Sequence, residues 1–418
     1  MRIAVVGTGI SGLVAAHLLA PQHELVVYEA GDHVGGHTHT HDVTVDGRTW
    51  AVDTGFIVFN ERTYPNLLAL FEKLGVRWKR SDMSFAVKCE RTGLEYNGTS
   101  TNALFAQRTN LLRPRFWRMI RDILRFYREA PALLEGEDDR LTLGEYLRRE
   151  RYSDAFVEEH LIPMGAAVWS TSPAGMLEFP ARYLVRFFDN HGFLQVDDRP
   201  DWLVVEGGSR SYVEPLTAGF ADAIRLHTPV TGIRRFADRV EIDSRSAGGE
   251  SRTESFDRVV IASHGDTALR LLQDPSDQER DVLGCFQTQA NETVLHTDAS
   301  LLPRRSLARA AWNFHVTPEE QQAVTVTYWM NRLQGLEDAP DFLVTLNRTE
   351  AIDPDKILRR LSYRHPLYTP AAVEAQGRHA EINGVNRTHF CGAYWRYGFH
   401  EDGVVSALAA VEPLGVTP

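Results

Sequence analysis

The fold of this chain is decided by residues 2–12, RIAVVGTGISG, at its beginning. The apolar run 2–6 predicts a strand, the glycines that follow predict a tight turn, and residues 13–19 predict a helix. In this order Gly7 permits the turn, Gly9 lets the backbone approach a pyrophosphate, and Gly12 lets the helix pack closely on the strand. We therefore interpret the motif as a dinucleotide-binding site.

The residues around these glycines indicate how a dinucleotide is held. Ile10 and Ser11 open the predicted helix, whose free N–H groups and positive dipole end favour phosphate. A second predicted strand, residues 24–28, ends at Glu29, seventeen residues after Gly12. A carboxylate at this point accepts a hydrogen bond from a ribose 2′-OH and repels a 2′-phosphate, so NADP is disfavoured.

Residues 30–38, AGDHVGGHT, continue directly from this acid and carry a second glycine pair. The run resembles the flavin-containing amine oxidoreductases, the superfamily of amine oxidases, protoporphyrinogen oxidases and carotenoid desaturases. That superfamily has Gly-Gly-Arg where this chain has Gly35-Gly36-His37. The resemblance implies FAD as the cofactor and places Gly35, Gly36, His37 and Thr38 beside it.

Three later segments resemble the same superfamily. Thr54 and Gly55 belong to an Asp-x-Gly segment that would pass the flavin, although a polar turn into a strand is an equal alternative. Val230 would offer its backbone to the adenine edge. The terminal motif would place five more residues beside the flavin, namely Gly392, Gly398, Asp402, Val404 and Val405. The helix that follows this motif would stabilise negative charge on a reduced flavin through its N–H groups and dipole.

The resemblance implies an α/β fold with a discontinuous Rossmann-like FAD-binding domain and an α+β substrate domain. We expect the FAD-binding domain in residues 1–80, 201–285 and 371–418. The substrate domain would have a helical part, residues 81–200, and a mixed or antiparallel sheet in residues 286–370.

Composition excludes several classes of protein. The net charge is −11, which disfavours a nucleic-acid partner because phosphate binding needs a basic surface. The three cysteines make neither a disulfide framework nor a metal cluster, and the histidines at 33, 37, 39 and 41 lack a metal-site spacing, so we expect no metal. No signal peptide and no run of about 18 apolar residues is found. We expect a cytoplasmic protein, with a peripheral contact to the inner face of the membrane left open.

One helix is unusual for an acidic chain. Residues 113–128 place arginines 118, 121, 125 and 128 at helical spacing and predict Trp117, Ile120, Ile123, Leu124 and Tyr127 on the opposite side. An ordinary surface helix with a solvated arginine face is the favoured interpretation. The alternative is a membrane-surface patch that admits a lipid substrate.

Aromatic residues of the helical part are candidates for the wall of an apolar substrate cavity. They are Trp169, Phe179, Phe187, Phe188 and His191. Side chains of this kind more often form plain core, so both interpretations stay open.

A closer resemblance, to one bacterial subfamily, rests on the runs 53–60, 163–171, 187–192 and 397–403. Its members are associated with cyclopropane-fatty-acid-synthase-like methyltransferases. The resemblance implies a hydrophobic or lipid acyl substrate, such as a methylated unsaturated fatty acyl chain, and a methyltransferase as a pathway partner.

The expected reaction is therefore dehydrogenation, or desaturation, by an FAD-dependent oxidoreductase. His37, Asn291 and Tyr394 are the catalytic candidates, chosen because they adjoin the motifs. Amine oxidases of the superfamily have a lysine where this chain has residues 291–293, NET, which argues against transferring their chemistry directly. An amine or amino-acid oxidase and a non-catalytic FAD-binding accessory subunit remain alternatives, and the terminal glycine motif disfavours an NAD-linked dehydrogenase.

Overall fold

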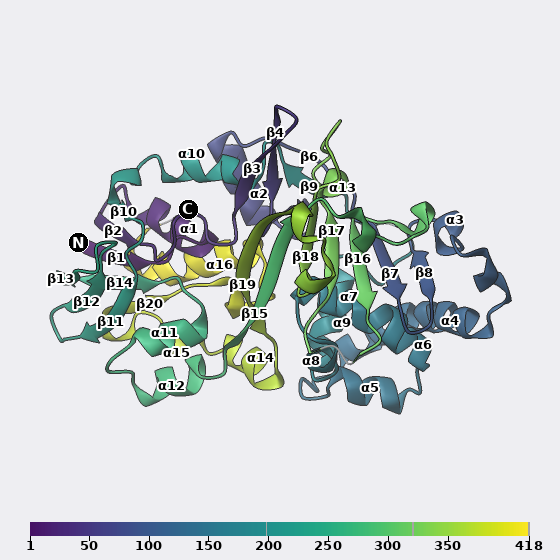
Figure 1. The fold of residues 1–418 in the computed structure, drawn as a ribbon. Coiled ribbons are helices and arrows are strands. Elements are labelled where there is room, and N and C mark those ends of the chain that lie inside the picture. Colours follow the sequence, from purple (N-terminus) through teal and green to yellow (C-terminus); the bar gives the residue numbers. More distant parts are fainter. Residues whose placement is uncertain (198, 320–321, 417–418) are drawn as a thin grey trace.

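A parallel five-stranded sheet forms one half of the molecule. The computed structural model describes residues 1–197, 199–319 and 322–416. The strand order is β10-β2-β1-β14-β20, with β1 (Arg2–Val6), β2 (Glu24–Tyr28), β10 (Ile224–Arg225), β14 (Arg258–Ile261) and β20 (Thr388–Phe390). These strands come from the beginning, the middle and the end of the chain. The discontinuous Rossmann-like domain expected from sequence is thereby confirmed (Figure 1).

Alternating side chains of these strands enter two different cores. Ile3 and Val5 pack with one set of helices, namely α1 (Ile10–Leu19), α2 (Pro65–Leu74), α10 (Val213–Thr217) and α16 (His400–Val411). Ala4 and Val6 pack in a second core, formed with β11 (Val230–Arg235), β12 (Val240–Arg245), β13 (Ser251–Phe256), α11 (Gly265–Leu271), α12 (Asp277–Leu283), α14 (Pro370–Gln376) and α15 (His379–Ile382). This period of two is the geometry of a strand buried on both faces.

A seven-stranded mixed sheet forms the other half. Its order is β19-β15-β18-β17-β16-β7-β8, with β15 (Gln287–His296), β16 (Trp312–Val316), β17 (Val326–Trp329), β18 (Leu343–Leu346), β19 (Ile357–Leu367), β7 (Phe85–Cys89) and β8 (Leu94–Asn97). All described pairings are antiparallel except β16 with β7. The long strands β15 and β19 run between the two halves of the molecule (Figure 1).

Helices between β8 and β9 complete the second half. They are α3 (Thr101–Leu104), α4 (Pro114–Glu129), α5 (Leu143–Arg149), α6 (Asp154–Phe156), α7 (Ile162–Trp169), α8 (Pro173–Leu177) and α9 (Ala181–Asn190). Two small antiparallel sheets join the halves, β3 (Thr40–Val45) with β4 (Arg48–Asp53), and β5 (Val58–Asn60) with β9 (Trp202–Val205) and β6 (Trp78–Arg80). No helix of the described residues is long and apolar enough to cross a membrane.

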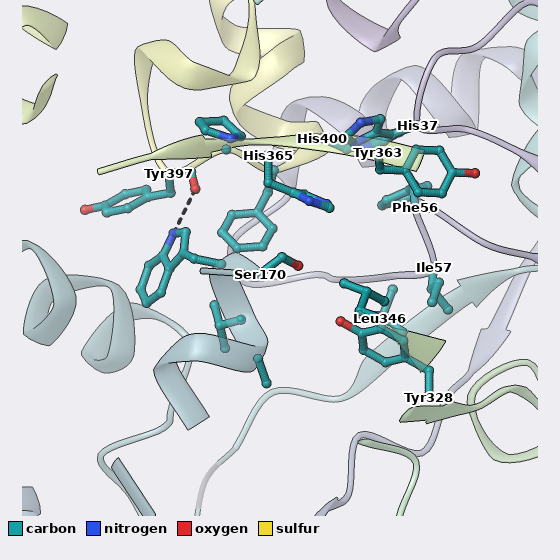
Figure 2. A pocket seen from close by; sticks show the side chains of 18 of the residues that line it. His37, Phe56, Ile57, Ser170, Tyr328, Leu346, Tyr363, His365, Tyr397 and His400 are labelled. Carbon is teal, nitrogen blue, oxygen red and sulfur yellow. Dashed lines mark hydrogen bonds between the residues drawn. The ribbon is translucent and has the colours of Figure 1, made fainter. Parts of the chain in front are cut away.

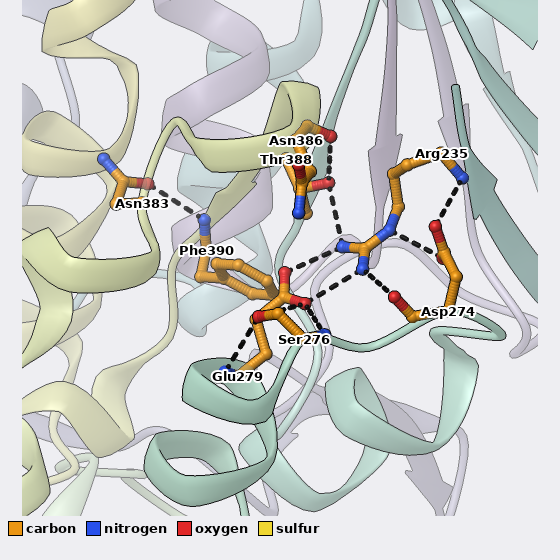
Figure 3. Close-up of polar contacts among 8 residues, drawn as sticks. All are labelled: Arg235, Asp274, Ser276, Glu279, Asn383, Asn386, Thr388 and Phe390. Atoms are coloured by element: carbon orange, nitrogen blue, oxygen red, sulfur yellow. Dashed lines mark hydrogen bonds and ion pairs between the residues drawn. The ribbon is translucent and has the colours of Figure 1, made fainter. Parts of the chain in front are cut away.

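A buried ion pair lies in the half that contains the parallel sheet. The Arg235 guanidinium on β11 contacts both carboxylate oxygens of Glu279 on α12, at 2.8 and 2.9 Å, and the Asp274 carboxylate at 2.7 Å. The side chains of Arg235 and Glu279 are 2% and 1% exposed. Figure 3 shows that Thr388, at the start of β20, reaches the same guanidinium. One arginine thus joins the hairpin sheet, a helix and the last parallel strand.

A second buried charge joins the two halves. The Asp53 carboxylate, at the end of β4, accepts hydrogen bonds from the Ser209 N–H at 3.0 Å, the Thr40 hydroxyl at 2.5 Å and the Gln334 amide at 2.9 Å. Gln334 follows α13 (Met330–Leu333) in the second half, whereas Ser209 follows a tight turn at Gly208, where φ is +90°. Burial raises the pKa of Asp53 to about 6 although these donors act to lower it.

We expect Asp53→Asn to destabilise the protein by about 1–3 kcal/mol, because an amide nitrogen would face groups that donate. The effect depends on pH. Since the folded pKa lies above the ordinary value of 3.8, the native state binds more protons than the unfolded chain between about pH 4 and about pH 6. The free energy of unfolding of the unsubstituted protein therefore falls as pH rises through this window. Asp53→Asn does not lose stability in this way, so the difference in free energy of unfolding between the two proteins becomes smaller as pH rises.

Urea unfolding across this pH range measures the difference. Asp222→Asn, at an exposed position, is the matched control and should change neither the stability nor its pH dependence. A difference between Asp53→Asn and the unsubstituted protein that stays constant with pH would contradict the assignment.

Candidate active site

The glycine motif forms an open cradle in the structure. An added Cβ at Gly12 would lie 2.0 Å from the Gly7 carbonyl oxygen, so α1 packs on the turn at the closest distance that glycine allows. An added Cβ at Gly9 would meet no heavy atom within 4 Å. An added Cβ at Gly36 would lie 3.0 Å from the Gly9 Cα, so the second glycine pair rests directly on the first motif. Gly36 has φ +61° and Gly35 has φ +131°, both of which favour glycine.

One end of this cradle opens into a cavity of about 500 Å³, which we call the nucleotide cavity. Gly7, Glu29 and Val230 line it together, as expected for the ribose and adenine end. The Glu29 carboxylate accepts hydrogen bonds from the Thr8 N–H at 3.0 Å and the Gly31 N–H at 2.7 Å. These two bonds hold it at the end of β2, where it can also accept from a ribose hydroxyl.

The other end reaches a cavity of about 160 Å³ between the two halves, which we call the inner cavity. His37, Thr54, Gly55 and Gly398, four residues expected near the flavin, line it. An added Cβ at Gly55 would lie 2.0 Å from the His37 carbonyl oxygen, so these two backbone segments need a glycine where they meet. Figure 2 shows His37 and His400 at one side of this cavity and Tyr328 and Leu346 at the other.

The inner cavity has no formal charge. None of the described residues that line it is Asp, Glu, Lys or Arg. Burial lowers the pKa of His365 to about 4 and that of His37 well below its ordinary value, and neighbouring imidazoles lower both further. Burial raises the pKa of Tyr363 to about 12. All of these groups are therefore neutral at physiological pH.

Asn291 positions one of these imidazoles. It is fully buried on β15, and its Nδ2 donates to the Ser170 carbonyl at 3.0 Å and to His365 Nδ1 at 2.9 Å. Its Oδ1 accepts from the Asn347 amide at 2.7 Å, which fixes the amide orientation. Because His365 Nδ1 accepts, its proton sits on Nε2. Asn291, a catalytic candidate from sequence, thus contacts His365 and is absent from the lining of the inner cavity.

The predicted residues of the terminal motif lie in different surroundings. The first turn of α16 packs on the first turn of α1, since an added Cβ at Gly403 would lie 2.5 Å from Ile10 Cγ2. Val404 is buried and Val405 half-buried in this turn. The Asp402 carboxylate accepts from the Phe399 N–H at 2.9 Å and faces away from the inner cavity, in a separate depression with Arg396. Burial raises its pKa to about 7.

Tyr394 lies outside the inner cavity. Its ring packs against Phe286 at 4.7 Å and against Trp395 at 5.1 Å, and it is 3% exposed. Gly392, at the end of β20, lies against the same ring, since an added Cβ there would be 2.4 Å from Tyr394 Cε1. Adjacency to a motif in the sequence therefore does not bring this tyrosine to the reacting side of the site.

A larger and mainly apolar cavity of about 520 Å³, the outer cavity, lies beside the inner one, and its lining also includes Asp82, Arg199 and Asp201. Val168 and Trp312 line both cavities. Trp169 lines the inner cavity and His191 the outer one, as two of the five predicted wall residues. Phe179, Phe187 and Phe188 are 1–2% exposed and form the aromatic core behind Trp169, which is the alternative interpretation of these residues.

Sequence reasoning did not find His365, Tyr363 or Ser170, which all line the inner cavity. The first two lie on β19, a strand that was not predicted. Their alternation, with Tyr363 and His365 two residues apart, was the available signal. Ser170 ends α7 in a left-handed conformation, φ +50°, which single-sequence patterns do not indicate for serine.

The histidine group near the second glycine pair is a stack of rings. The His33 and His39 centroids are 3.7 Å apart, and His41 lies 4.0 Å from His39. In the described part of the chain, no three His, Cys, Asp or Glu side chains are grouped to hold a metal ion.

The second and third glycines of the motif, Gly9 and Gly12, allow a matched test. Gly9→Ala adds a methyl group to open space, so we expect unchanged stability of the cofactor-free protein but at least about tenfold weaker nucleotide binding, because backbone must approach the pyrophosphate there. Gly12→Ala forces a clash with the Gly7 carbonyl and should lower the stability itself. Urea unfolding without cofactor, together with cofactor titration, separates the two effects. Equal stability losses in both variants would refute the assigned cradle.

Comparison with known proteins agrees with this geometry. A family model described as flavin containing amine oxidoreductase matches residues 10–301. Cyclohexylamine oxidase from Brevibacterium oxydans IH-35A has a TM-score of 0.71 at 16% identity, covering 99% of both chains. A CLA-producing fatty acid isomerase from P. acnes has a TM-score of 0.68 at 17% identity, also covering 99% of both chains. Putrescine oxidase bound to putrescine has a TM-score of 0.65 at 17% identity over the same share of each chain.

These identities show a shared fold and leave the substrate undecided. A search of curated proteins by sequence gives no match. The family model nevertheless spans more than half of the chain, including Gly12, Gly35, Gly36 and the helical wall of the two cavities. This chain therefore belongs to the flavin-containing amine oxidoreductase family, and its cofactor is FAD.

Proposed function

We propose that this flavin oxidoreductase dehydrogenates a long apolar substrate, such as a methylated unsaturated fatty acyl chain. One observation carries the proposal: the uncharged inner cavity adjoins a larger apolar cavity at Val168 and Trp312. Placing a charged group in the inner cavity would cost desolvation energy without a charged partner. A hydrocarbon segment meets no such cost, and the outer cavity offers room for the rest of its chain.

Different residues of the chain would have different roles in this reaction. Gly9, Gly36 and Glu29 would hold the dinucleotide part of FAD, and His37 and Gly55 would lie beside its ring. Bound FAD would supply the oxidising chemistry by accepting two electrons with one hydrogen as hydride. The second hydrogen leaves the substrate as a proton, and His37, neutral by burial, is our candidate to accept it.

His365 has an orienting role in this proposal. Its Nε2–H is a donor, because Nδ1 accepts from Asn291. Its ring can pack against the apolar segment of the substrate and so fix which carbon–carbon bond lies over the reacting position. Asn291 is then a positioning residue that acts through His365.

An amine oxidase is the second candidate. Tyr328, Tyr363 and Tyr397 give the inner cavity an aromatic wall that suits a neutral amine. Two of the similar structures are amine oxidases by title. An amino-acid oxidase is less well supported, because the described lining holds no arginine for a carboxylate. The fatty acid isomerase has the same fold at similar identity, so a fatty acyl substrate is equally compatible with the architecture.

Anaerobic titration of the FAD-loaded protein separates the candidates. Phospholipids with methylated unsaturated acyl chains should bleach the oxidised-flavin absorbance, whereas primary amines and polyamines should not. Bleaching by amines alone would replace the proposal with the oxidase. Bleaching by dithionite only would favour a flavin-binding accessory subunit.

Val168→Phe tests whether the two cavities act together. The larger side chain would narrow the junction, so we expect flavin reduction by a long-chain substrate to slow by about tenfold or more, with normal FAD content and normal dithionite reduction. Val385→Phe, at a surface position that is 41% exposed, is the control. Unchanged reduction in Val168→Phe would show that the substrate does not pass this point.

A further inference from the structure

The helix α4 differs in the structure from its sequence-based description. Its buried face is formed by Phe116, Met119 and Phe126, and not by the apolar residues that the pattern placed opposite the arginines. Ile120, Ile123 and Tyr127 line the outer cavity instead. The helix therefore has a core face, a cavity face and a solvent face, and apolar residues occupy all three.

Large apolar side chains are exposed on α4, on the turn before it and at the outer cavity. Leu111 is 49% exposed, Leu112 87%, Trp117 48%, Leu124 52% and Val196 65%. We call these five residues the entry rim. They are five of the ten large hydrophobic residues that are exposed in the described part of the chain, and Leu124 and Val196 also line the outer cavity itself. An apolar cluster of this kind at a cavity mouth marks a surface with a partner.

The segment that carries four of the five entry-rim residues is basic, although the whole chain is acidic. Three of its arginines, Arg115, Arg125 and Arg128, form ion pairs with glutamates. Residues 108–128 contain seven arginines and one aspartate, in a protein of net charge −11. The aspartate, Asp122, is buried and accepts from the Ser153 N–H at 3.0 Å. Among the described residues no ion pair is formed by Arg118, and the contact of Arg121 is a 3.9 Å approach to Asp122. The Arg121 side chain is 74% exposed.

We infer that the N-terminal half of α4 and the entry rim dock on the surface of an anionic phospholipid bilayer. Exposed leucine, tryptophan and arginine on one short helix are the features of an interfacial segment, with apolar groups entering the headgroup region and arginines meeting lipid phosphates. The acidic run 135–140 lies beyond the other end of α4, where Asp139 pairs with Arg182. Only the first half of the helix therefore suits an anionic surface.

Docking in this orientation opens the outer cavity toward the bilayer. An acyl chain could leave the membrane at Leu124 and Val196 and pass between Ile120 and Phe193 toward the Val168 junction without crossing water. The inference rests on the proposed function only in taking the substrate to be apolar. Membrane binding itself is measured without turnover, so the two can fail separately.

Co-sedimentation of the FAD-loaded protein with vesicles provides the test. We expect binding to phosphatidylcholine vesicles that contain phosphatidylglycerol, weaker binding to phosphatidylcholine alone, and a loss of binding at high salt. Arg118→Glu/Arg121→Glu should lower binding to the anionic vesicles at least about tenfold. Leu112→Asp should lower binding to both kinds of vesicle, because it removes an apolar contact.

Arg245→Glu/Arg280→Glu is the matched control. It changes the net charge by the same amount at exposed positions on β12 and α12, in the nucleotide-binding half, and should leave vesicle binding near that of the unsubstituted protein. FAD absorbance and circular dichroism report whether each variant is folded. Equal binding by the α4 double variant and the unsubstituted protein, or an equal loss in the control, would overturn the inference. Binding to an acidic protein but not to anionic vesicles would overturn it as well.

If vesicles bind but no lipid bleaches the flavin, the docking surface stands and the proposed substrate is wrong. If dispersed lipid bleaches the flavin and vesicles do not bind, the proposed function stands and the docking surface is wrong.

Discussion

The buried carboxylate of Asp53 is the constraint on which the site depends. It lies at the end of β4 and accepts hydrogen bonds from β3, from the residue after the Gly207-Gly208 turn and from the segment after α13. Gly55 follows it by two residues, and Thr40, one of its donors, follows His37 by three. The hydrogen bonds to this carboxylate therefore fix where the segments that carry His37 and Gly55 enter the inner cavity. Asp53→Asn would keep one acceptor oxygen but would turn an amide nitrogen toward these buried donors.

Charged and neutral groups are distributed differently in the different parts of the molecule. Buried charges such as Asp53 and Arg235 are surrounded by donors or acceptors and join secondary-structure elements. The inner cavity holds only neutral groups, because burial keeps its imidazoles deprotonated and its phenols protonated. Positive charge gathers on the exposed side of α4. In our proposal, an apolar substrate would arrive from an anionic lipid surface at α4 and then reach the neutral inner cavity.

Much of the cofactor half could be predicted because its signals are local. The strand–turn–helix motif needs glycine at three fixed positions, and the structure shows the physical cause at Gly12, where any Cβ would meet the Gly7 carbonyl. Val230 and Glu29 share the nucleotide cavity as expected. The helix over residues 113–128 was also predicted, since Pro114 starts it and the periodicity is strong. Its faces were not, because amphipathic spacing cannot distinguish a core from a cavity lined by the same apolar side chains.

The sequence by itself determined the dinucleotide fold, the position of Glu29 at the end of β2 and the glycine motifs, because each follows from backbone geometry within a few residues. The tertiary structure alone decided which side chains reach the reacting region. His365 and Tyr363 enter it from β19, and Asn291 supports His365 from β15, across a separation of 74 residues in the chain. Tyr394 is excluded because its ring packs into a separate core. Such contacts depend on the pairing and packing of distant segments, and no local pattern in one sequence encodes that geometry.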